Sequence, residues 1–349
     1  MERYSHGGDI YRNPNIRYDF SVNTNPLGMP AAVQKALAES IPRFGQYPDP
    51  RCQELTGCLA DFEGIPAPHI LVTNGAADLI FRLCLAVKPK KALLAAPSFS
   101  EYEKALRDAG SEVVYHPLRE ETGFVLQEDY LSRLTPEVEM LFLCNPNNPS
   151  GRLIAPELLK RILDVCKKQS ILAVVDECFM DFTEEPAAYT AKPFLPDYEN
   201  LVVIKAFTKT FAMAGLRLGY GLFGSRALME KVQAFGQSWS VSFPAQVAGS
   251  AALESCQEYL RQTTGMISQE RAFLDAELSK CGFKVYPSQA NFILFQGQAG
   301  LDKLLLGKGI LIRSCGNFIG LIESYFRIAV RTREENLALL GAVKEVLHG

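Results

Sequence analysis

One short segment of the chain combines small residues in a way that could bind an anion. The apolar run Ile70–Thr73 is followed by Gly75, Ala76 and Ala77, which open a stretch of helical period. Small residues at the start of a helix let backbone N–H groups approach a negatively charged group such as a phosphate. Most turns of this kind bind no ligand, so this segment indicates an anion site only in combination with other segments of the chain.

Three further segments place reactive or polar side chains after apolar runs. Asn148 lies in the turn NPNNPSG, which follows the run MLFLC, and Asp176 follows the run LAVV. Lys209 and Arg217 lie eight residues apart in FTKTFAMAGLRLGYGLF. A carboxylate that closes a buried strand is costly unless a cation meets it. Each segment also has an ordinary explanation, such as turn chemistry for Asn148 or a solvated surface for Lys209.

Together these segments supply every group that pyridoxal phosphate (PLP) needs. Ligands of open α/β sheets bind at the carboxyl ends of strands, so side chains that follow strands are expected to meet. Lys209 suits the aldehyde as a Schiff base, Asp176 suits the pyridine nitrogen, and Asn148 suits the phenolic oxygen. The groups suited to the phosphate are Gly75, Ala76, Ala77, Thr208 and Arg217. This conjunction predicts a PLP enzyme with Lys209 and Asp176 as its catalytic residues.

Composition argues against several other classes of protein. The formal net charge is −3 and no basic stripe stands out, so nucleic acid is not an expected partner. Charged residues interrupt each apolar run before the ~18 residues of a membrane span. The polar start of the chain lacks a signal core, so we expect a cytoplasmic protein. The nine cysteines are scattered without zinc-ligand spacing, so no metal site is expected.

The chain is long enough for a large domain and a smaller one. From about residue 50 to 225, strand-like runs alternate with helical stretches such as Ala155–Lys168, which predicts a mostly parallel sheet between helices. The expected strands are Ile70–Thr73, Ala92–Ala95, Glu112–His116, Met140–Cys144, Leu172–Val175, Leu201–Ile204 and Leu218–Leu222.

Beyond about residue 250 the pattern changes to a long helical stretch followed by short strands. The helix is expected over Glu258–Lys280, and the strands over Asn291–Phe295, Gly309–Arg313 and Tyr325–Val330. These elements predict a smaller α+β domain. The expected boundaries are an N-terminal arm at 1–22, a large PLP-binding domain at 23–252 and a small domain at 253–349.

The chain resembles, over nearly its whole length, the fold type I PLP enzymes of the aspartate aminotransferase superfamily, near the histidinol-phosphate aminotransferase branch. Their pattern of Asn, Asp, Lys and a following Arg is matched by Asn148, Asp176, Lys209 and Arg217. The family's RYPDP segment reads QYPDP here. In the family this tyrosine reaches the cofactor phosphate of the neighbouring subunit, so the resemblance implies that Tyr47 serves a homodimer with shared active sites.

Three positions near the expected cofactor need separate comment. By the resemblance, Phe99 in APSFSEY would stack on the pyridine ring, although its spacing fits core packing equally well. Phe179 stands where aminotransferases usually have a tyrosine that binds the phenolic oxygen, so one hydrogen bond is expected to be missing. Ala206 replaces a common Ser or Thr, and Thr208 is the candidate to contact the phosphate instead.

Three arginines near the C-terminal end suggest a doubly anionic substrate. Arg327 in YFRI matches the family's carboxylate-binding arginine, and Arg313 in GILIRSCGN matches a phosphate-binding position of this branch. Arg331 adds a third positive charge, although a solvated surface position explains it as well. The resemblance therefore implies a small phosphorylated amino acid as substrate.

Closer motifs resemble the threonine-phosphate decarboxylases of cobalamin biosynthesis. These motifs are the arm HGGDI with His6, the segment DFSVNTNPLGMP with Asn23, the stretch DECFMDF, and IRSCGNFIGL with YFRIAVR. The resemblance implies decarboxylation of O-phospho-L-threonine to (R)-1-amino-2-propanol O-2-phosphate and CO2. We expect Arg313 and Arg331 to bind the phosphate, and Arg327 with His6 to orient the carboxylate. A histidinol-phosphate or related aminotransferase and an O-phospho-L-serine decarboxylase remain alternatives.

Overall fold

The fold is built on a seven-stranded sheet with strand order β2-β8-β7-β6-β5-β3-β4. The computed structural model describes residues 6–13, 15–254 and 256–348. The strands of the large sheet are β2 (Ile70–Thr73), β3 (Lys91–Ala96), β4 (Glu112–Pro117), β5 (Met140–Cys144), β6 (Leu172–Asp176), β7 (Leu201–Ala206) and β8 (Gly219–Phe223). Strand β8 is antiparallel to both of its neighbours, and the other pairs are parallel. The predicted mostly parallel sheet is confirmed.

Helices cover both faces of this sheet, which explains why its strands are continuously apolar. Leu93 and Leu141 pack with α5 on one face, while Leu94 and Phe142 pack with α3 and α4 on the other. The helices of this part of the chain are α1 (Ala31–Ser40), α2 (Gln53–Glu63), α3 (Ala76–Val87), α4 (Ser100–Asp108), α5 (Pro156–Gln169), α6 (Pro186–Tyr189), α7 (Phe207–Thr210), α8 (Arg226–Gln233) and α9 (Phe243–Leu253).

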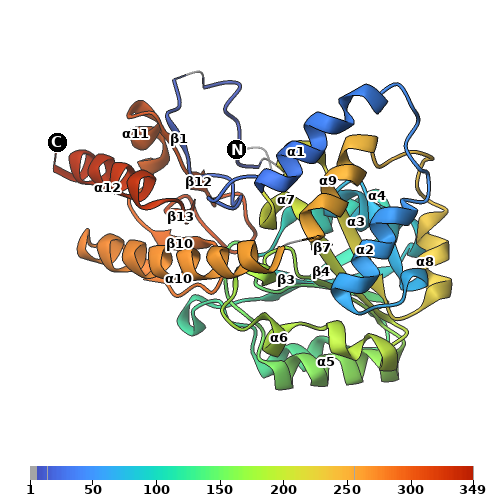
Figure 1. Ribbon diagram of the computed structural model, residues 1–349. Coiled ribbons are helices and arrows are strands. Elements are labelled where there is room, and N and C mark those ends of the chain that lie inside the picture. The colour runs from blue at the N-terminus through green and yellow to red at the C-terminus, as the bar shows by residue number, and fades with distance from the viewer. Residues whose placement is uncertain (1–5, 14, 255, 349) are drawn as a thin grey trace.

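The C-terminal part of the chain forms a second layer beside the large sheet, drawn in orange to red in Figure 1. A four-stranded sheet with order β12-β13-β10-β9 packs against the long helix of this region. The elements are α10 (Cys256–Lys280), β9 (Lys284–Tyr286), β10 (Phe292–Gln296), α11 (Leu301–Gly307), β11 (Ile310–Leu311), β12 (Arg313–Ser314), β13 (Tyr325–Ala329) and α12 (Arg333–His348). The predicted long helix and two of the predicted strands are confirmed to within two residues.

The strand predicted over Gly309–Arg313 is wrong in one respect, because the structure divides it in two. Strand β11 pairs in parallel with β1 (Tyr18–Asp19), whereas β12 pairs with β13. A continuous apolar run gave no sign that the chain changes partners at Ile312. The switch directs the side chain of Arg313 toward the neighbouring Arg327 on β13.

The N-terminal segment is more ordered than its irregular sequence indicates. Strand β1 lies beside the C-terminal elements in Figure 1. Phe20 is fully buried in their core, and its carbonyl accepts a hydrogen bond of 2.8 Å from the amide of Ala329. Tertiary burial of one aromatic residue therefore orders a segment that has no periodicity of its own. Among the described helices, none is long and apolar enough to cross a membrane.

Candidate active site

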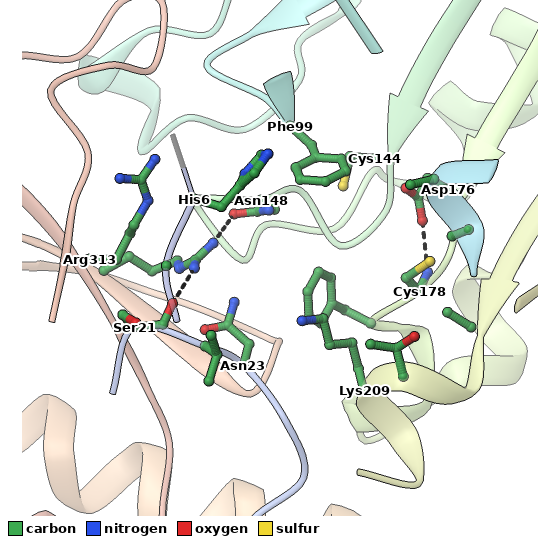
Figure 2. A pocket seen from close by; sticks show the side chains of 18 of the residues that line it. His6, Ser21, Asn23, Phe99, Cys144, Asn148, Asp176, Cys178, Lys209 and Arg313 are labelled. Carbon is green, nitrogen blue, oxygen red and sulfur yellow. Dashed lines mark hydrogen bonds between the residues drawn. The ribbon is translucent and has the colours of Figure 1, made fainter. Parts of the chain in front are cut away.

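A cavity of about 220 Å³ lies between the large sheet and the C-terminal sheet. Its lining includes the last residues of β5, β6 and β7, which are Cys144, Asp176 and Ala206. Figure 2 shows Lys209 pointing into this cavity, with Asp176 at one side and Arg313 and His6 at the other. The carboxyl ends of parallel strands thus meet where ligands of α/β sheets bind.

Lys209 lies in the single turn α7 directly after β7. Burial, together with the nearby positive charges of Arg327 and Arg217, lowers the pKa of its amine to about 8. At pH 7 roughly a tenth of the amine is therefore unprotonated, far more than for a lysine with the ordinary pKa. A neutral amine is the form that attacks an aldehyde, so Lys209 has the electrostatic environment of a nucleophile.

Asp176 receives hydrogen bonds on both carboxylate oxygens. The hydroxyl of Tyr102 donates to Oδ2 at 2.6 Å, and the backbone amide of Cys178 donates to Oδ1 at 3.0 Å. Burial raises the pKa of Asp176, whereas these hydrogen bonds, which favour the ionised form, lower it. The hydrogen bonds donated to this buried carboxylate come from neutral groups, which leaves a cationic partner to be supplied by a ligand.

The first turn of α3 and Arg217 form one end of the cavity. Gly75 has a φ of 82°, which favours glycine, and a Cβ atom there would lie 2.8 Å from Nη2 of Arg217. Arg217 itself adopts a left-handed conformation with a φ of 58°. Ala76, Ala77 and Thr208 also line the cavity. A helix N-terminus and a guanidinium group side by side are suited to a phosphate.

The opposite end is built by two buried arginines on neighbouring strands. Arg313 and Arg327 face each other across the antiparallel pair β12 and β13. The guanidinium of Arg327 donates to Oδ1 of Asn148 and, at 2.9 Å, to the carbonyl oxygen of Ser21. Burial lowers the pKa of Arg327 to about 10, to which Arg313 contributes. Two like charges in this position are unfavourable unless an anion lies near them.

The N-terminal arm reaches the rim of the cavity through close backbone contacts. A Cβ atom on Gly7 would lie 2.3 Å from the carbonyl oxygen of Ser21, and the amide of Gly8 donates to the Ser21 hydroxyl at 2.7 Å. This packing brings the ring of His6 to 5.7 Å from that of Phe99 and to 2.7 Å from a carboxylate oxygen of Glu101. Gly7 is therefore required because a side chain would collide with Ser21, and Gly8 because its φ of 89° favours glycine.

Two other residues chosen from sequence also line the cavity. Asn23 is buried, and among the described residues its side-chain oxygen has no hydrogen-bond partner. Phe179 packs edge to face on Phe292, with ring centroids 5.0 Å apart. An unpaired buried oxygen at a cavity wall is a position that a ligand's donor group would satisfy.

Two predicted site residues, Arg331 and Tyr47, lie outside the cavity lining within one chain. Among the described residues, Arg331 is not part of the cavity lining, because its guanidinium turns away and donates to the carbonyl oxygen of Asp19 at 2.8 Å. This arrangement gives no support to its expected contact with a substrate phosphate, which stays a prediction. Tyr47 is 81% exposed and packs on Trp239, with centroids 4.9 Å apart, so within one chain it contributes nothing to the cavity.

Sequence reasoning missed several residues of the cavity lining. These residues are Gly7, Ser21, Val22, Tyr102, Cys144, Cys178 and Phe318. Tyr102 follows Phe99 by three residues at the start of α4, a spacing that places both on one side of a helix start. That spacing was a usable signal. The positions of Ser21 and Phe318 depend on long-range packing and carried no local signal.

The donor set of the cavity fits PLP. A partly neutral lysine amine, a buried carboxylate with neutral partners, and a helix N-terminus beside an arginine correspond to the aldehyde, the pyridine nitrogen and the phosphate. Phe99 lines the same cavity and offers an aromatic ring. Among the described residues, no cluster of His, Cys, Asp and Glu side chains is suited to a metal ion.

Comparisons with known proteins agree with this chemistry. The sequence profile of the family described as aminotransferase class I and II matches residues 16–343. Threonine-phosphate decarboxylase of Salmonella typhimurium is 37% identical, with 99% of this chain and 97% of that protein covered. The crystal structure of the histidinol-phosphate aminotransferase from Clostridium acetobutylicum superposes with a TM-score of 0.88 at 31% identity, covering 95% of this chain and 99% of that one.

A second solved structure, that of L-threonine-O-3-phosphate decarboxylase from Porphyromonas gingivalis, has a TM-score of 0.84 at 28% identity and covers 95% of this chain and all of that one. The matches extend over both sheets and the cavity between them. The chain therefore belongs to the class I and II aminotransferase family of PLP-dependent enzymes.

Proposed function

We propose that the chain decarboxylates O-phospho-L-threonine to (R)-1-amino-2-propanol O-2-phosphate and CO2, as a step of cobalamin biosynthesis. The observation that carries this proposal is the pair of buried arginines, Arg313 and Arg327, that lie opposite each other on β12 and β13 and line the cavity. Figure 2 shows Arg313 at the end of the cavity away from Asp176. A substrate that carries both a carboxylate and a phosphate offsets both charges. The 37% identity to the Salmonella typhimurium threonine-phosphate decarboxylase supports the same substrate.

The two arginines divide the substrate's anionic groups between them. Nε of Arg327 is buried without a partner in the described part of the chain, so its guanidinium retains a donor for a carboxylate oxygen. Asn148 and Ser21 hold the other nitrogens of this guanidinium and so set its plane. Arg313, 7% exposed and backed by the ring of Phe318 at 5.4 Å, is then the group that binds the phosphate.

The remaining residues bind the cofactor and move a proton. When bound, PLP supplies an electron sink that stabilises negative charge on the substrate Cα. Asp176 would meet the pyridine nitrogen, Phe99 the ring and Asn148 the phenolic oxygen. The phosphate would be held by Gly75, Ala76, Ala77, Thr208 and Arg217. Lys209, whose pKa is lowered to about 8, can carry a proton to Cα after the carboxylate leaves.

The arm supports decarboxylation over transamination. His6 lies beside Phe99 at the rim, on the same side of the cavity as Arg313, where it can help Arg327 orient the substrate carboxylate. The side-chain oxygen of Asn23, unpaired among the described residues, is left for a donor group of the substrate. Phe179 offers no hydroxyl to the phenolic oxygen, which alters the cofactor environment relative to that of aminotransferases. Which bond to Cα breaks depends on how these residues hold the carboxylate.

An aminotransferase acting on a phosphorylated substrate is the second candidate. The observation for this candidate is the TM-score of 0.88 with a histidinol-phosphate aminotransferase structure. The shared scaffold is compatible with both reactions, because a fold alone does not determine which reaction an enzyme catalyses. It predicts a keto product, whereas decarboxylation predicts CO2. O-phospho-L-serine differs from the proposed substrate by one methyl group, which changes binding by only ~1–3 kcal/mol.

We also propose a cytoplasmic homodimer with shared active sites. Tyr47 packs on Trp239 and both rings are exposed, as are Ile41 and Phe44 earlier in the same segment; exposed large hydrophobic side chains of this kind are typical of an interface. In a dimer Tyr47 would reach the cofactor phosphate of the other subunit.

The proposed domain boundaries stay at 1–22, 23–252 and 253–349. Strand β1 at the end of the arm packs on the small domain. Residues 1–5 and 14 lie outside the described part of the arm.

Product analysis tests the proposal directly. Purified protein with PLP is incubated with O-phospho-L-threonine, with O-phospho-L-serine, and with histidinol phosphate plus 2-oxoglutarate. We expect stoichiometric CO2 and the amino-alcohol phosphate from O-phospho-L-threonine, with kcat/KM at least ~10-fold above that for O-phospho-L-serine. Glutamate formation from histidinol phosphate without CO2 release would establish the aminotransferase instead.

A further inference from the structure

Tyr102 connects two groups that face the cofactor from different sides. Its hydroxyl donates to Oδ2 of Asp176 at 2.6 Å, and its ring meets the edge of Phe99 with centroids 5.5 Å apart and planes at 83°. Its other contact is a stack on Phe142, with centroids 4.8 Å apart and planes at 10°. The tyrosine is fully buried, so its orientation is set by packing from both sides.

We propose that Tyr102 is a positioning residue that keeps Asp176 ionised and aimed at the pyridine nitrogen of PLP while it braces the ring of Phe99. This inference rests on the cofactor placement given under the proposed function, and it is independent of which substrate the enzyme takes. It assigns to a residue of α4 a part in controlling the protonation of the cofactor.

The hydrogen bonds of Asp176 explain why the tyrosine is needed. Each carboxylate oxygen can accept more than one hydrogen bond. With Cys178 donating to Oδ1 and Tyr102 to Oδ2, the plane of the carboxylate is fixed while lone pairs remain for a pyridinium N–H. Burial alone favours the neutral carboxylic acid, and that form would compete with the pyridine nitrogen for the proton.

The direction of the proton in this pair follows from burial. Burial and the Asp176 charge raise the pKa of Tyr102 well above its usual value, so the proton stays on the phenol and the hydroxyl acts as a donor. The same hydrogen bond lowers the pKa of Asp176 against the effect of burial. Without it, the carboxylate would bind its own proton more readily and bind a pyridinium less tightly.

The contact with Phe99 links this electrostatic effect to geometry. Phe99 is the N-cap residue of α4 and Tyr102 lies in its first turn, so one short helix carries both side chains. A change in the position of Tyr102 would shift the ring of Phe99 and the carboxylate of Asp176 together. Removing only the hydroxyl separates the two effects, because both ring contacts of Tyr102 remain.

The chain offers two matched controls for Tyr102→Phe. Tyr130 is also fully buried, and in the described part of the chain its hydroxyl has no hydrogen-bond partner. Tyr220 is buried and donates to a carboxylate oxygen of Glu63 at 2.6 Å, away from the cavity. Tyr130→Phe therefore reports the loss of a buried hydroxyl, and Tyr220→Phe reports the loss of a buried bond to a carboxylate.

The test reads the protonation of the cofactor without substrate. Each protein is loaded with PLP that carries ¹⁵N in the pyridine ring, the ¹⁵N chemical shift is measured by NMR, and the affinity of the apoprotein for PLP is measured by titration. We expect Tyr102→Phe to move the shift toward unprotonated pyridine and to weaken PLP binding roughly 10-fold, as for a lost hydrogen bond to a charged group. Both control variants should keep the wild-type shift.

Two results would overturn the inference about Tyr102. A wild-type shift in Tyr102→Phe, or an equal change in Tyr220→Phe, overturns it. If Tyr102→Phe does not fold, 3-fluorotyrosine at position 102 retains the shape and donates a stronger hydrogen bond, so the shift should move toward protonated pyridine; no movement refutes the inference. A wild-type protein that binds PLP and shows these shifts but releases no CO2 refutes only the decarboxylase proposal.

Discussion

The two walls of the cavity satisfy their buried charges in different ways. On the cofactor wall, at the carboxyl ends of β5 to β7, Asp176 has a hydrogen bond on each oxygen from within the chain. On the substrate wall, Arg327 lies opposite another buried arginine, and its Nε has no partner in the described structure. The hydrogen bonds of the first wall are made within the chain, while on the second wall Nε of Arg327 remains available to an anion.

This difference assigns separate tasks to the two walls. A preorganised wall with satisfied hydrogen bonds can hold a cofactor in one orientation through many turnovers. A wall where two buried guanidinium groups lie on paired strands binds most strongly to a substrate with anionic groups, so it is suited to selecting what enters. Changes on the cofactor wall should therefore abolish the chemistry, and changes on the substrate wall should reduce selectivity and affinity.

The largest effect is expected from Lys209→Ala on the cofactor wall. Without the amine, PLP cannot be held covalently and no side chain at this position can return a proton to Cα, so kcat should fall by at least ~10³-fold. The visible absorption band of covalently held PLP should also disappear. Persistence of that band in the variant would show that another lysine is the anchor.

Arg327→Met and Arg331→Met compare a cavity residue with one four positions later. Because Arg327 faces the cavity, its loss should lower kcat/KM about 100-fold through the missing charge-assisted hydrogen bonds, while the absorption band of PLP persists. Arg331 contacts the backbone of Asp19 instead, so its loss should cost less than ~5-fold. Steady-state kinetics with O-phospho-L-threonine provide the measurement. An equal fall in kcat/KM for both variants would show that Arg331 also contacts the substrate.

The smallest effect is a pH dependence that couples the two walls. Burial and the charges of Arg327 and Arg217 lower the pKa of Lys209 to about 8, so below that pH most of the amine is protonated and unreactive. The rate at which apoprotein attaches PLP should rise about tenfold from pH 7 to pH 9 and level off above the pKa. Stopped-flow absorbance measures this rate. In Arg327→Met the midpoint should move to higher pH, and an unchanged midpoint would mean that the arginine does not influence Lys209.

The sequence predicted the cofactor wall far better than the substrate wall. Asp176, Lys209 and Asn148 each follow a strand that local pattern identifies, and strand ends of a parallel sheet converge by geometry alone. Arg331 lies outside the described cavity lining, because the direction of its side chain past the end of β13 depends on the carbonyl of Asp19, nearly the whole chain away. Tyr102 was missed because its partner is 74 residues distant, although its spacing from Phe99 was visible.

The pairing of β1 with β11 has a consequence for the order in which the chain acquires its structure. Tyr18 and Ile310 are partners about 290 residues apart, and Phe20 completes a core that, apart from Phe179 and Phe182, is made from residues 267–343. At translation rates of ~5–20 residues per second, the first segment must wait on the order of 15–60 s for its partner to leave the ribosome. The contacts that seat Gly7, Gly8 and His6 depend on Ser21 in this segment. The arm therefore reaches the cavity only after synthesis is nearly finished, which makes closure of the active site a late, long-range event in folding.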